Sequence, residues 1–324
     1  MSTPTLAEIR AVRERLKGKV RVTPTLTLPM RDLDRTWTDD AEAIFKLELF
    51  QVTGTFKARG ALNGMLALSD AQRAKGVTAV SAGNHAVAVA YAAQALGLSA
   101  RVVMIKTANP LRVELAKSFG ADVEFAEHGT AAFARVKEIE TQEGRFFVHP
   151  FEGPGPVTGT ATLGLEWIEQ APAMDAVVIA CGGGGLLGGV AAAIKQASPS
   201  TQVFGVEPEG ADNMNQSFEK GEPATLPKVA TIADSLGPPY STPYTFGVCK
   251  QFVDGMVRVS DDAIRNAMRL SLRVLKLAVE PAGAAALAGV LGPLREALRG
   301  KKRIGILVCG ANIDAETFCK QVMA

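Results

Sequence analysis

The chain has little of what marks several classes of protein. Its 324 residues include four cysteines and three histidines, and its net charge is +2. The cysteines follow no metal-ligand spacing, so we expect reduced thiols in a cytoplasmic protein. Lysine and arginine are scattered, which argues against nucleic acid or an anionic membrane as a partner. Residues 1–19 lack the apolar core of a signal peptide, and no run approaches the roughly 20 apolar residues of a membrane span.

What is present is a repeated pattern of strand, turn and helix. A mostly parallel α/β sheet is predicted by short apolar runs, at 77–80, 101–105, 123–125, 175–180, 203–206 and 304–308. Helices are predicted over 110–119 and 186–196. Two such series, roughly 76–150 and 150–324, meet in the Pro/Gly-rich stretch 149–156, the best candidate for a boundary. After the last strand we expect no room for a regulatory domain.

A run of glycines follows the predicted strand 175–180 and precedes a helix. Glycines allow close approach of the backbone to a phosphate, and the helix N-terminus adds its positive dipole. The run comprises Gly182, Gly183, Gly184 and Gly185. With Gly188 it also fits G-x-G-x-x-G, and Glu207 follows about 20 residues later, as in a dinucleotide fold. Taken alone, the motif leaves a phosphate-bearing cofactor and a dinucleotide both open.

Lys57 stands at the start of a predicted helix, after a Thr/Gly turn. The segment 51–61 resembles the cofactor-lysine motif of fold-type II pyridoxal phosphate enzymes, more narrowly the serine/threonine dehydratase and serine racemase family. The resemblance extends over nearly the whole chain, in the same order. It implies that Lys57 carries pyridoxal 5′-phosphate as a Schiff base and that Phe56 lies against the ring.

The same resemblance implies the architecture. We expect an α/β fold of the tryptophan synthase β type, with two open, twisted, mostly parallel sheets flanked by helices. Residues 1–75 and 151–324 would form a large cofactor-binding domain, and 76–150 a small domain on the substrate side. A cytoplasmic homodimer acting on a small amino-acid substrate is also implied.

A second strand-to-helix junction carries Ser81, Ala82, Gly83, Asn84 and His85. Backbone N–H groups and a hydroxyl at a positive helix end suit a carboxylate. By resemblance this loop binds the substrate carboxylate, and the Asn84 side chain bonds the ring hydroxyl of the cofactor.

Two later segments, 280–284 and 308–312, complete the resemblance. They imply that Glu280 contributes to the cofactor site and that Cys309 faces the pyridine nitrogen. A neutral thiol would leave that nitrogen unprotonated. The weaker electron sink suits prompt expulsion of a β-leaving group.

The segment 207–213 resembles the divalent-cation loop of the same family. Glu207, the carbonyl of Ala211 and the side chain of Asn213 would bind Mg²⁺ or another divalent cation. The acidic residue often found at the last position is Asn213 here, which lowers the ligand charge. A structural acidic loop is the alternative.

The implied reaction is β-elimination from an L-3-hydroxy amino acid, giving a 2-oxo acid and ammonia, with Lys57 taking the α-proton. Threonine, serine, phenylserine and 3-hydroxyaspartate are candidate substrates. Racemisation needs a second acid/base on the opposite face of the α-carbon. The racemases have a serine where this chain has Ala82, so a dehydratase is favoured. A racemase and an NAD-binding oxidoreductase remain the alternatives.

Two segments depart from the family pattern. Relatives usually have Gln-Gly where this chain has Val87-Ala88, and Ala-Gly-Gln-Gly-Thr where it has residues 158–162. If these positions border the substrate pocket, the pocket is less polar. We therefore hypothesise a substrate bulkier or more apolar than serine, such as threonine or phenylserine. Neutral drift behind the site is the alternative.

Overall fold

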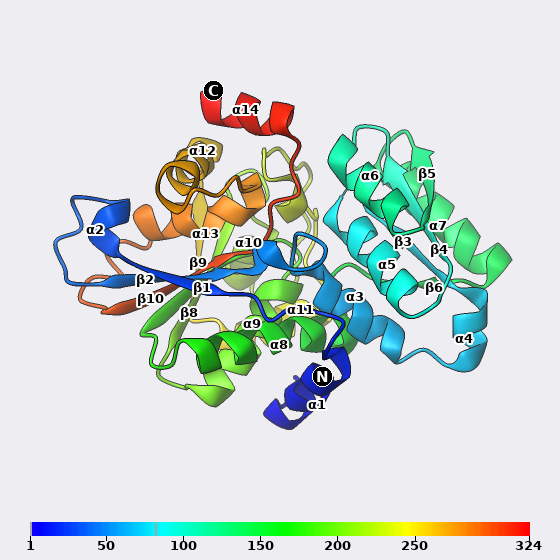
Figure 1. Cartoon of the computed structure of the whole chain (residues 1–324), viewed down its shortest axis with the longest axis horizontal. Coiled ribbons are helices and arrows are strands. Elements are labelled where there is room, and N and C mark those ends of the chain that lie inside the picture. Colours follow the sequence, from blue (N-terminus) through cyan, green and yellow to red (C-terminus); the bar gives the residue numbers. More distant parts are fainter. Residues whose placement is uncertain (1, 82) are drawn as a thin grey trace.

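The strands form two sheets in the structure, a computed structural model that describes residues 2–81 and 83–324. The larger sheet has the order β1-β2-β10-β7-β8-β9, and the smaller has the order β5-β4-β3-β6. Only β1 and β2 pair antiparallel among these neighbours. The predicted fold class, with two mostly parallel sheets flanked by helices, is confirmed (Figure 1).

The larger sheet takes strands from both ends of the chain. Its strands are β1 (Thr25–Pro29), β2 (Glu42–Leu47), β7 (Ala176–Ala180), β8 (Gln202–Pro208), β9 (Gly255–Val259) and β10 (Arg303–Val308). Every residue of β7 is buried, because helices cover both of its faces. The continuous apolar run at 175–180 therefore indicated a central parallel strand.

Helices α9 (Gly185–Ala197) and α13 (Pro281–Leu291) contact the larger sheet from its two faces (Figure 1). Behind α9 lie α1 (Leu6–Leu16), α8 (Pro154–Gln170) and α11 (Pro243–Phe252). On the α13 side lie α12 (Asp261–Leu270) and α14 (Ala315–Met323). The remaining helices of this part are α2 (Met30–Leu33), α3 (Lys57–Leu66) and α10 (Asn213–Lys220).

The smaller sheet is built from a continuous stretch of chain. Its strands are β3 (Val77–Val80), β4 (Ala100–Ile105), β5 (Asp122–Ala126) and β6 (Phe146–Phe147). Its helices are α4 (Asp70–Lys75), α5 (Asn84–Ala95), α6 (Pro110–Ser118) and α7 (Gly129–Glu143). Alternate residues point to opposite faces of a strand. Val102 accordingly packs in the core under α5, and Val103 packs under α7.

Helix α3 joins the two parts of the molecule. Its Leu62 and Met65 belong to the core of the smaller sheet, although they precede residue 76. A buried ion-pair network holds its other side against α8. The Arg59 guanidinium donates to Glu48 at 2.7 Å and to Glu166 at 3.0 Å. The boundaries of two domains remain a prediction.

Helices α8 and α9 cross at very short range. A Cβ atom added at Gly189 would lie 2.4 Å from the carbonyl oxygen of Val157, so only glycine fits there. The Thr160 hydroxyl, on α8, donates to the carbonyl of Gly185 at 2.7 Å. The crossing thereby fixes the loop between β7 and α9. None of the helices among the described residues is long and apolar enough to cross a membrane.

Candidate active site

Lys57 opens α3, after β2, the short helix η1 (Glu48–Phe50) and a turn. The backbone N–H of Phe56 donates to the carbonyl of Cys309 at 3.3 Å, which places the start of α3 at the carboxyl end of β10. Lys57 Nζ donates to the carbonyl of Pro150 at 2.9 Å and lies 5.1 Å from the centroid of the Phe56 ring. Loss of hydration lowers the pKa of Lys57 to about 8, against the attraction of Cys309 and Glu280. This side chain can therefore supply a neutral amine near neutral pH.

The glycine loop follows β7 and leads into α9. Gly184 has a left-handed φ of +86°, which glycine adopts without strain. A Cβ atom at Gly183 would lie 2.4 Å from the Phe151 ring, and one at Gly185 would lie 2.9 Å from the Phe151 carbonyl oxygen. The loop is therefore bare backbone at a helix N-terminus, an arrangement that fits a phosphate group.

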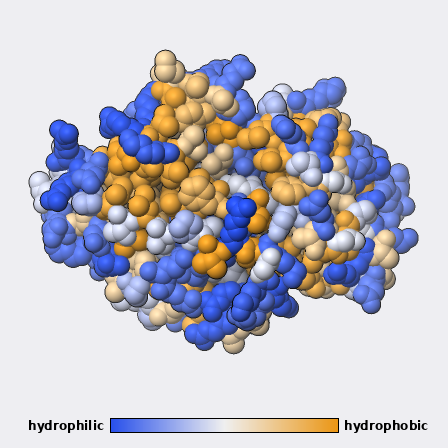
Figure 2. All heavy atoms as spheres, in the orientation of Figure 1, coloured by the Kyte–Doolittle hydropathy of each residue, from blue (hydrophilic) through white to orange (hydrophobic). Residues whose placement is uncertain are grey.

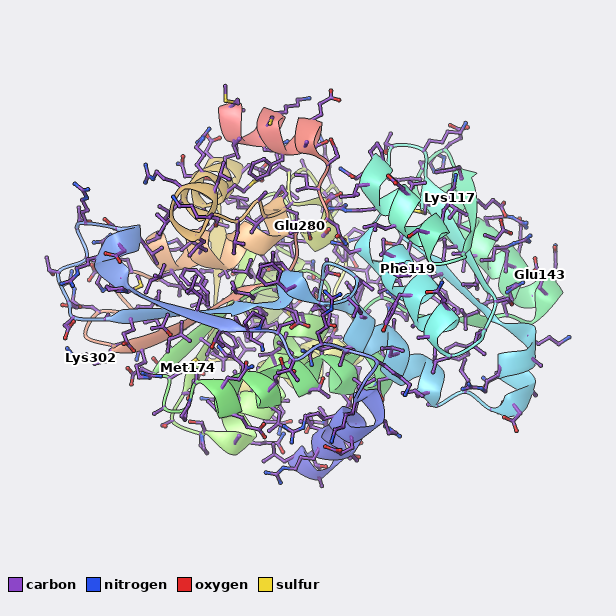
Figure 3. The ribbon with its side chains drawn as sticks, viewed as in Figure 1. Lys117, Phe119, Glu143, Met174, Glu280 and Lys302 are labelled. Carbon is purple, nitrogen blue, oxygen red and sulfur yellow. The ribbon has the colours of Figure 1, made fainter. Side chains whose placement is uncertain are left out.

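Asn84 is the first residue of α5, on the smaller sheet, and its side chain reaches the larger sheet. Its Nδ2 donates to Glu280 at 2.7 Å and to the Ser235 hydroxyl at 3.2 Å. Its Oδ1 accepts from Asn312 Nδ2 at 2.9 Å. Figure 3 shows Glu280 at the N-terminal end of α13, on the side of the larger sheet that faces the smaller one. Burial raises the pKa of Glu280, and the Arg112 guanidinium opposes that rise.

The loop expected to bind a carboxylate lies at the N-terminus of α5. The Ser81 hydroxyl accepts from the backbone N–H of Gly83 at 3.0 Å. His85 Nε2 lies 2.7 Å from the carbonyl oxygen of Val148, and burial lowers the pKa of this imidazole to about 3. The prediction for Ala82 lies outside the described residues.

Cys309 follows β10 and is buried. Its Sγ lies 3.5 Å from the carbonyl oxygen of Ala282. Burial raises the pKa of this thiol, which stays neutral. The structure therefore gathers a lysine, a neighbouring aromatic ring, a glycine cradle and a neutral thiol. This donor set fits a phosphorylated aldehyde cofactor.

The residues expected to bind a cation do not fit one. The Glu207 carboxylate accepts from the backbone N–H groups of Met214 and Asn215 and from the Asn215 side chain, at 2.7–2.9 Å. Asn213 Oδ1 accepts from the Ser241 hydroxyl at 2.6 Å. Within residues 2–81 and 83–324, no group of three His, Cys, Asp or Glu residues could hold a metal. With their oxygens engaged, Glu207 and Asn213 do not form a site with Ala211. The same bonds leave Glu207 unavailable to a ribose hydroxyl.

Three residues that the sequence did not single out also meet here. Arg112, on α6, is buried and donates to Asp234 at 2.5 Å, to the Asn312 carbonyl at 2.8 Å and to Glu280 at 3.4 Å. Asn312 lay inside the segment 308–312, but no role was predicted for it. Arg112 had no signal, because it looks like an ordinary charge on a surface helix.

The third residue is His149, which follows β6. Its Nδ1 accepts from the backbone N–H groups of Phe151 and Glu152, and its ring stacks edge to face on Phe147 and Phe151. Its position at the carboxyl end of a parallel strand was the available signal, since sites gather there. Strand β6 is too short to be predicted from a pattern.

A pocket opens beside Lys57. Its lining is mostly apolar: Phe56, Lys57, Gly60, Ala61, His85, His149, Pro150, Phe151, Pro156, Thr160, Gly185 and Leu186. Of the positions that depart from the family pattern, Thr160 borders this pocket. Val87 and Ala88 are fully buried in the core of the smaller sheet. Only the later of the two segments can therefore act on the pocket directly.

The comparisons with known proteins agree with this geometry. The family described as "Pyridoxal-phosphate dependent enzyme" matches residues 18–310. The chain is 54% identical to the phenylserine dehydratase of Ralstonia pickettii, over 98% of this chain and 96% of the relative. It is 38% identical to a catabolic L-threonine dehydratase of Escherichia coli, over 84% of this chain and 83% of the relative. The structure of maize serine racemase is similar with a TM-score of 0.92 at 35% identity, over 99% of both chains.

Proposed function

Because the chain belongs to the family of pyridoxal-phosphate-dependent enzymes, we propose that it dehydrates an L-3-hydroxy amino acid with an aromatic side chain. The reaction is that of a lyase: a 3-hydroxy amino acid loses water and then ammonia, and a 2-oxo acid remains. The observation that carries the aromatic substrate is the 54% identity to a phenylserine dehydratase over nearly the full length of both chains. The dinucleotide alternative is no longer tenable.

We propose the roles of the site residues from the positions they occupy. Lys57 would bind the cofactor, residues 182–185 would hold its phosphate, and Phe56, Asn84, Glu280 and Cys309 would surround its ring. Bound pyridoxal phosphate supplies an electron-accepting ring that stabilises negative charge on the substrate α-carbon. The residues of the chain bind the cofactor and the substrate, orient them and move protons.

The proton of the α-carbon is taken by the Lys57 amine in this proposal. A base works best when its pKa is close to the working pH, and the pKa of about 8 at Lys57 meets that condition. The first backbone N–H groups of α5 would hold the substrate carboxylate, because they have no partner within the helix and lie at its positive end. Lys57 and this helix end would together orient the Cα–H bond.

The lining of the pocket supports an aromatic substrate. Besides Phe56, which we assign to the cofactor ring, Phe151 and Leu186 make the lining apolar, as suits a phenyl ring. Among the described lining residues Lys57 is the one cation, because both histidines are held neutral by burial. A second carboxylate, as in 3-hydroxyaspartate, would be desolvated without a partner of opposite charge.

Racemisation is the second candidate, because the chain resembles maize serine racemase closely. Position 82 argues against it. An alanine there has no hydroxyl to return a proton on the opposite face of the α-carbon. The dehydration assay below distinguishes the two when the D-isomer is measured alongside.

The test is release of 2-oxo acid and ammonia from phenylserine, L-threonine, L-serine and 3-hydroxyaspartate, with cofactor supplied. We expect phenylserine to have the highest kcat/KM and 3-hydroxyaspartate the lowest. A preference for L-serine or 3-hydroxyaspartate would contradict the aromatic substrate. Lys57→Ala is the control, and it should lack both the visible absorption of the bound cofactor and the activity.

We also propose a cytoplasmic homodimer. Cys181, Cys249 and Cys309 are free and buried, as suits a reducing compartment. A groove between α2, α12 and α13 has an apolar lining that includes Leu33, Ala267, Leu270, Ala288 and Leu291. Figure 2 shows hydrophobic residues gathered over this part of the surface. Light scattering of the purified protein tests the dimer, and a monomer would contradict it.

A further inference from the structure

Two imidazoles line the pocket beside Lys57, and each is held in one neutral tautomer by its hydrogen bonds. One offers an acceptor and the other a donor. His85 uses Nε2 to donate to the carbonyl oxygen of Val148, at 2.7 Å. His149 uses Nδ1 to accept from two backbone N–H groups, at 3.3 Å from Phe151 and 2.9 Å from Glu152. A neutral imidazole has one donor and one acceptor. His85 therefore offers an acceptor at Nδ1, and His149 offers a donor at Nε2.

The neutral state of His149 follows from its contacts. Two N–H groups point at Nδ1, so this nitrogen carries a lone pair and no proton. The single hydrogen of the ring must then reside on Nε2. Burial of the ring lowers the pKa of His149 to about 4, in agreement with this geometry. Among residues 2–81 and 83–324, no side chain or carbonyl accepts the Nε2 hydrogen.

The His149 ring is held firmly beside the lysine. It packs edge to face on Phe151, with 4.8 Å between ring centroids, and on Phe147, with 5.7 Å. The next residue, Pro150, accepts the hydrogen bond from Lys57 Nζ. Both side chains line the same pocket, so the base and the fixed neutral donor border one space.

We propose that His149 is a further catalytic residue, whose Nε2–H donates a hydrogen bond to the β-oxygen of the substrate as that oxygen leaves. The proposal rests on the proposed dehydration. The Cβ–O bond breaks and its electron pair goes to oxygen. The proton that Lys57 has taken from the α-carbon then passes to the leaving hydroxide, which departs as water. His149 begins and ends the step as a neutral donor.

This role predicts a dependence on the leaving group. Hydroxide is a poor leaving group, so a hydrogen bond that stabilises charge on the oxygen speeds its departure. Chloride leaves without such help. 3-Chloroalanine undergoes the same β-elimination on the same cofactor and therefore separates this role from a merely structural one.

Two substitutions separate the roles of the two nitrogens of His149, acceptance at Nδ1 and donation at Nε2. In His149→Asn the side-chain oxygen can still accept from Phe151 and Glu152, but the donor is removed. In His149→Gln an amide N–H can reach the place of Nε2. We expect His149→Asn to lose roughly 100- to 1,000-fold in kcat on phenylserine. Turnover of 3-chloroalanine should stay within about 3-fold, and His149→Gln should recover part of the loss.

His128→Asn is the matched control. His128 is exposed, and its Nδ1 caps α7 by accepting from Ala131 at 3.2 Å, so the exchange tests the same chemistry away from the site. His128→Asn should change the turnover of neither substrate. Absorption of the bound cofactor and thermal unfolding are measured on each variant, to confirm equal loading and folding.

Two outcomes would overturn the role of His149. One is an equal fall in kcat on phenylserine and 3-chloroalanine in His149→Asn. The other is no fall in kcat on phenylserine. If the unaltered enzyme eliminates chloride but releases water from no hydroxy amino acid, the proposed function itself has failed, and the role of His149 with it. The rates of the unaltered enzyme alone identify that case.

Discussion

The Lys57 amine shows how burial makes a base. Water stabilises an ammonium ion, and its loss lowers the pKa of Lys57 to about 8. Glu280 and Cys309 act in the opposite direction, but the loss of hydration is the larger effect. A lysine in this place is therefore partly neutral near neutral pH.

This lowered pKa predicts how the cofactor-free protein captures its cofactor. Only the neutral amine attacks an aldehyde, so below about pH 8 the capture rate should rise roughly tenfold per pH unit and then level off. Stopped-flow absorbance between about pH 6 and about pH 10 measures it. A rate that continues to rise between about pH 8 and about pH 10 would show an ordinary lysine.

Residues in recognised motifs could be located from the sequence, and those outside the motifs could not. Lys57, Asn84, Glu280 and Cys309 lie far apart in the chain, yet the structure brings them together. Arg112 was missed because its importance arises from the distant Asp234 and Glu280, which its local sequence does not reveal.

At the scale of elements, the crossing of α8 and α9 fixes the glycine loop. Gly189 allows the approach, and Thr160 ties α8 to Gly185. The interior is packed so tightly that an added methyl group must displace backbone. Stability and the shape of the cradle therefore depend on the same contact.

A pair of glycine substitutions tests this crossing. We expect Gly189→Ala to lower the free energy of unfolding by about 1–3 kcal/mol, because its Cβ would meet the Val157 carbonyl oxygen at 2.4 Å. Gly64→Ala is the control. Nothing lies within 4 Å of a Cβ at Gly64, in the last turn of α3, and a gain of about 0.4–1 kcal/mol is expected. Urea unfolding measures both, and equal effects would refute the tight crossing.

Elements with clear turn signals were predicted well. The helices expected over 110–119 and 186–196 correspond to α6 and α9, each within one residue at either end. Strands β1, β2, β6 and β9 were not predicted. Strands β1 and β9 are partly exposed edge strands, and β6 has two residues, so none of the three shows a buried apolar run. Strand β2 is buried, but the buried Lys46 interrupts its apolar pattern.

For the whole molecule, Arg112 is one tie between the two sheets, beside α3 and Asn84. It extends from α6 on the smaller sheet to Asp234, in the short helix η2 (Asp234–Leu236), and to Glu280 beside the larger sheet. Glu280 in turn orients Asn84. The contact between the two sheets and the alignment of the cofactor site thus share one guanidinium group.

Removal of the Arg112 guanidinium should lower the free energy of unfolding strongly. Arg112→Met leaves the buried Glu280 carboxylate without its cation, and we expect a loss of about 3–5 kcal/mol in the free energy of unfolding. Arg265→Met is the comparison, because Arg265 pairs with the exposed Asp262, and such pairs contribute about 1 kcal/mol or less. Urea denaturation gives both values. A loss below about 1 kcal/mol for Arg112→Met would contradict the tie.

The pairing of β2 with β10 has a consequence for biosynthesis. Glu42 lies opposite Arg303, so the larger sheet joins segments from the two ends of the chain. The smaller sheet uses residues 77–147 alone and can form while the ribosome is still at work. Lys57 leaves the ribosome early, but Cys309, its neighbour in the site, is synthesised about 250 residues later. A nascent chain that stops before β10 therefore has its lysine without the strand that completes the cofactor site, and the capacity for catalysis arises only once β10 has been made.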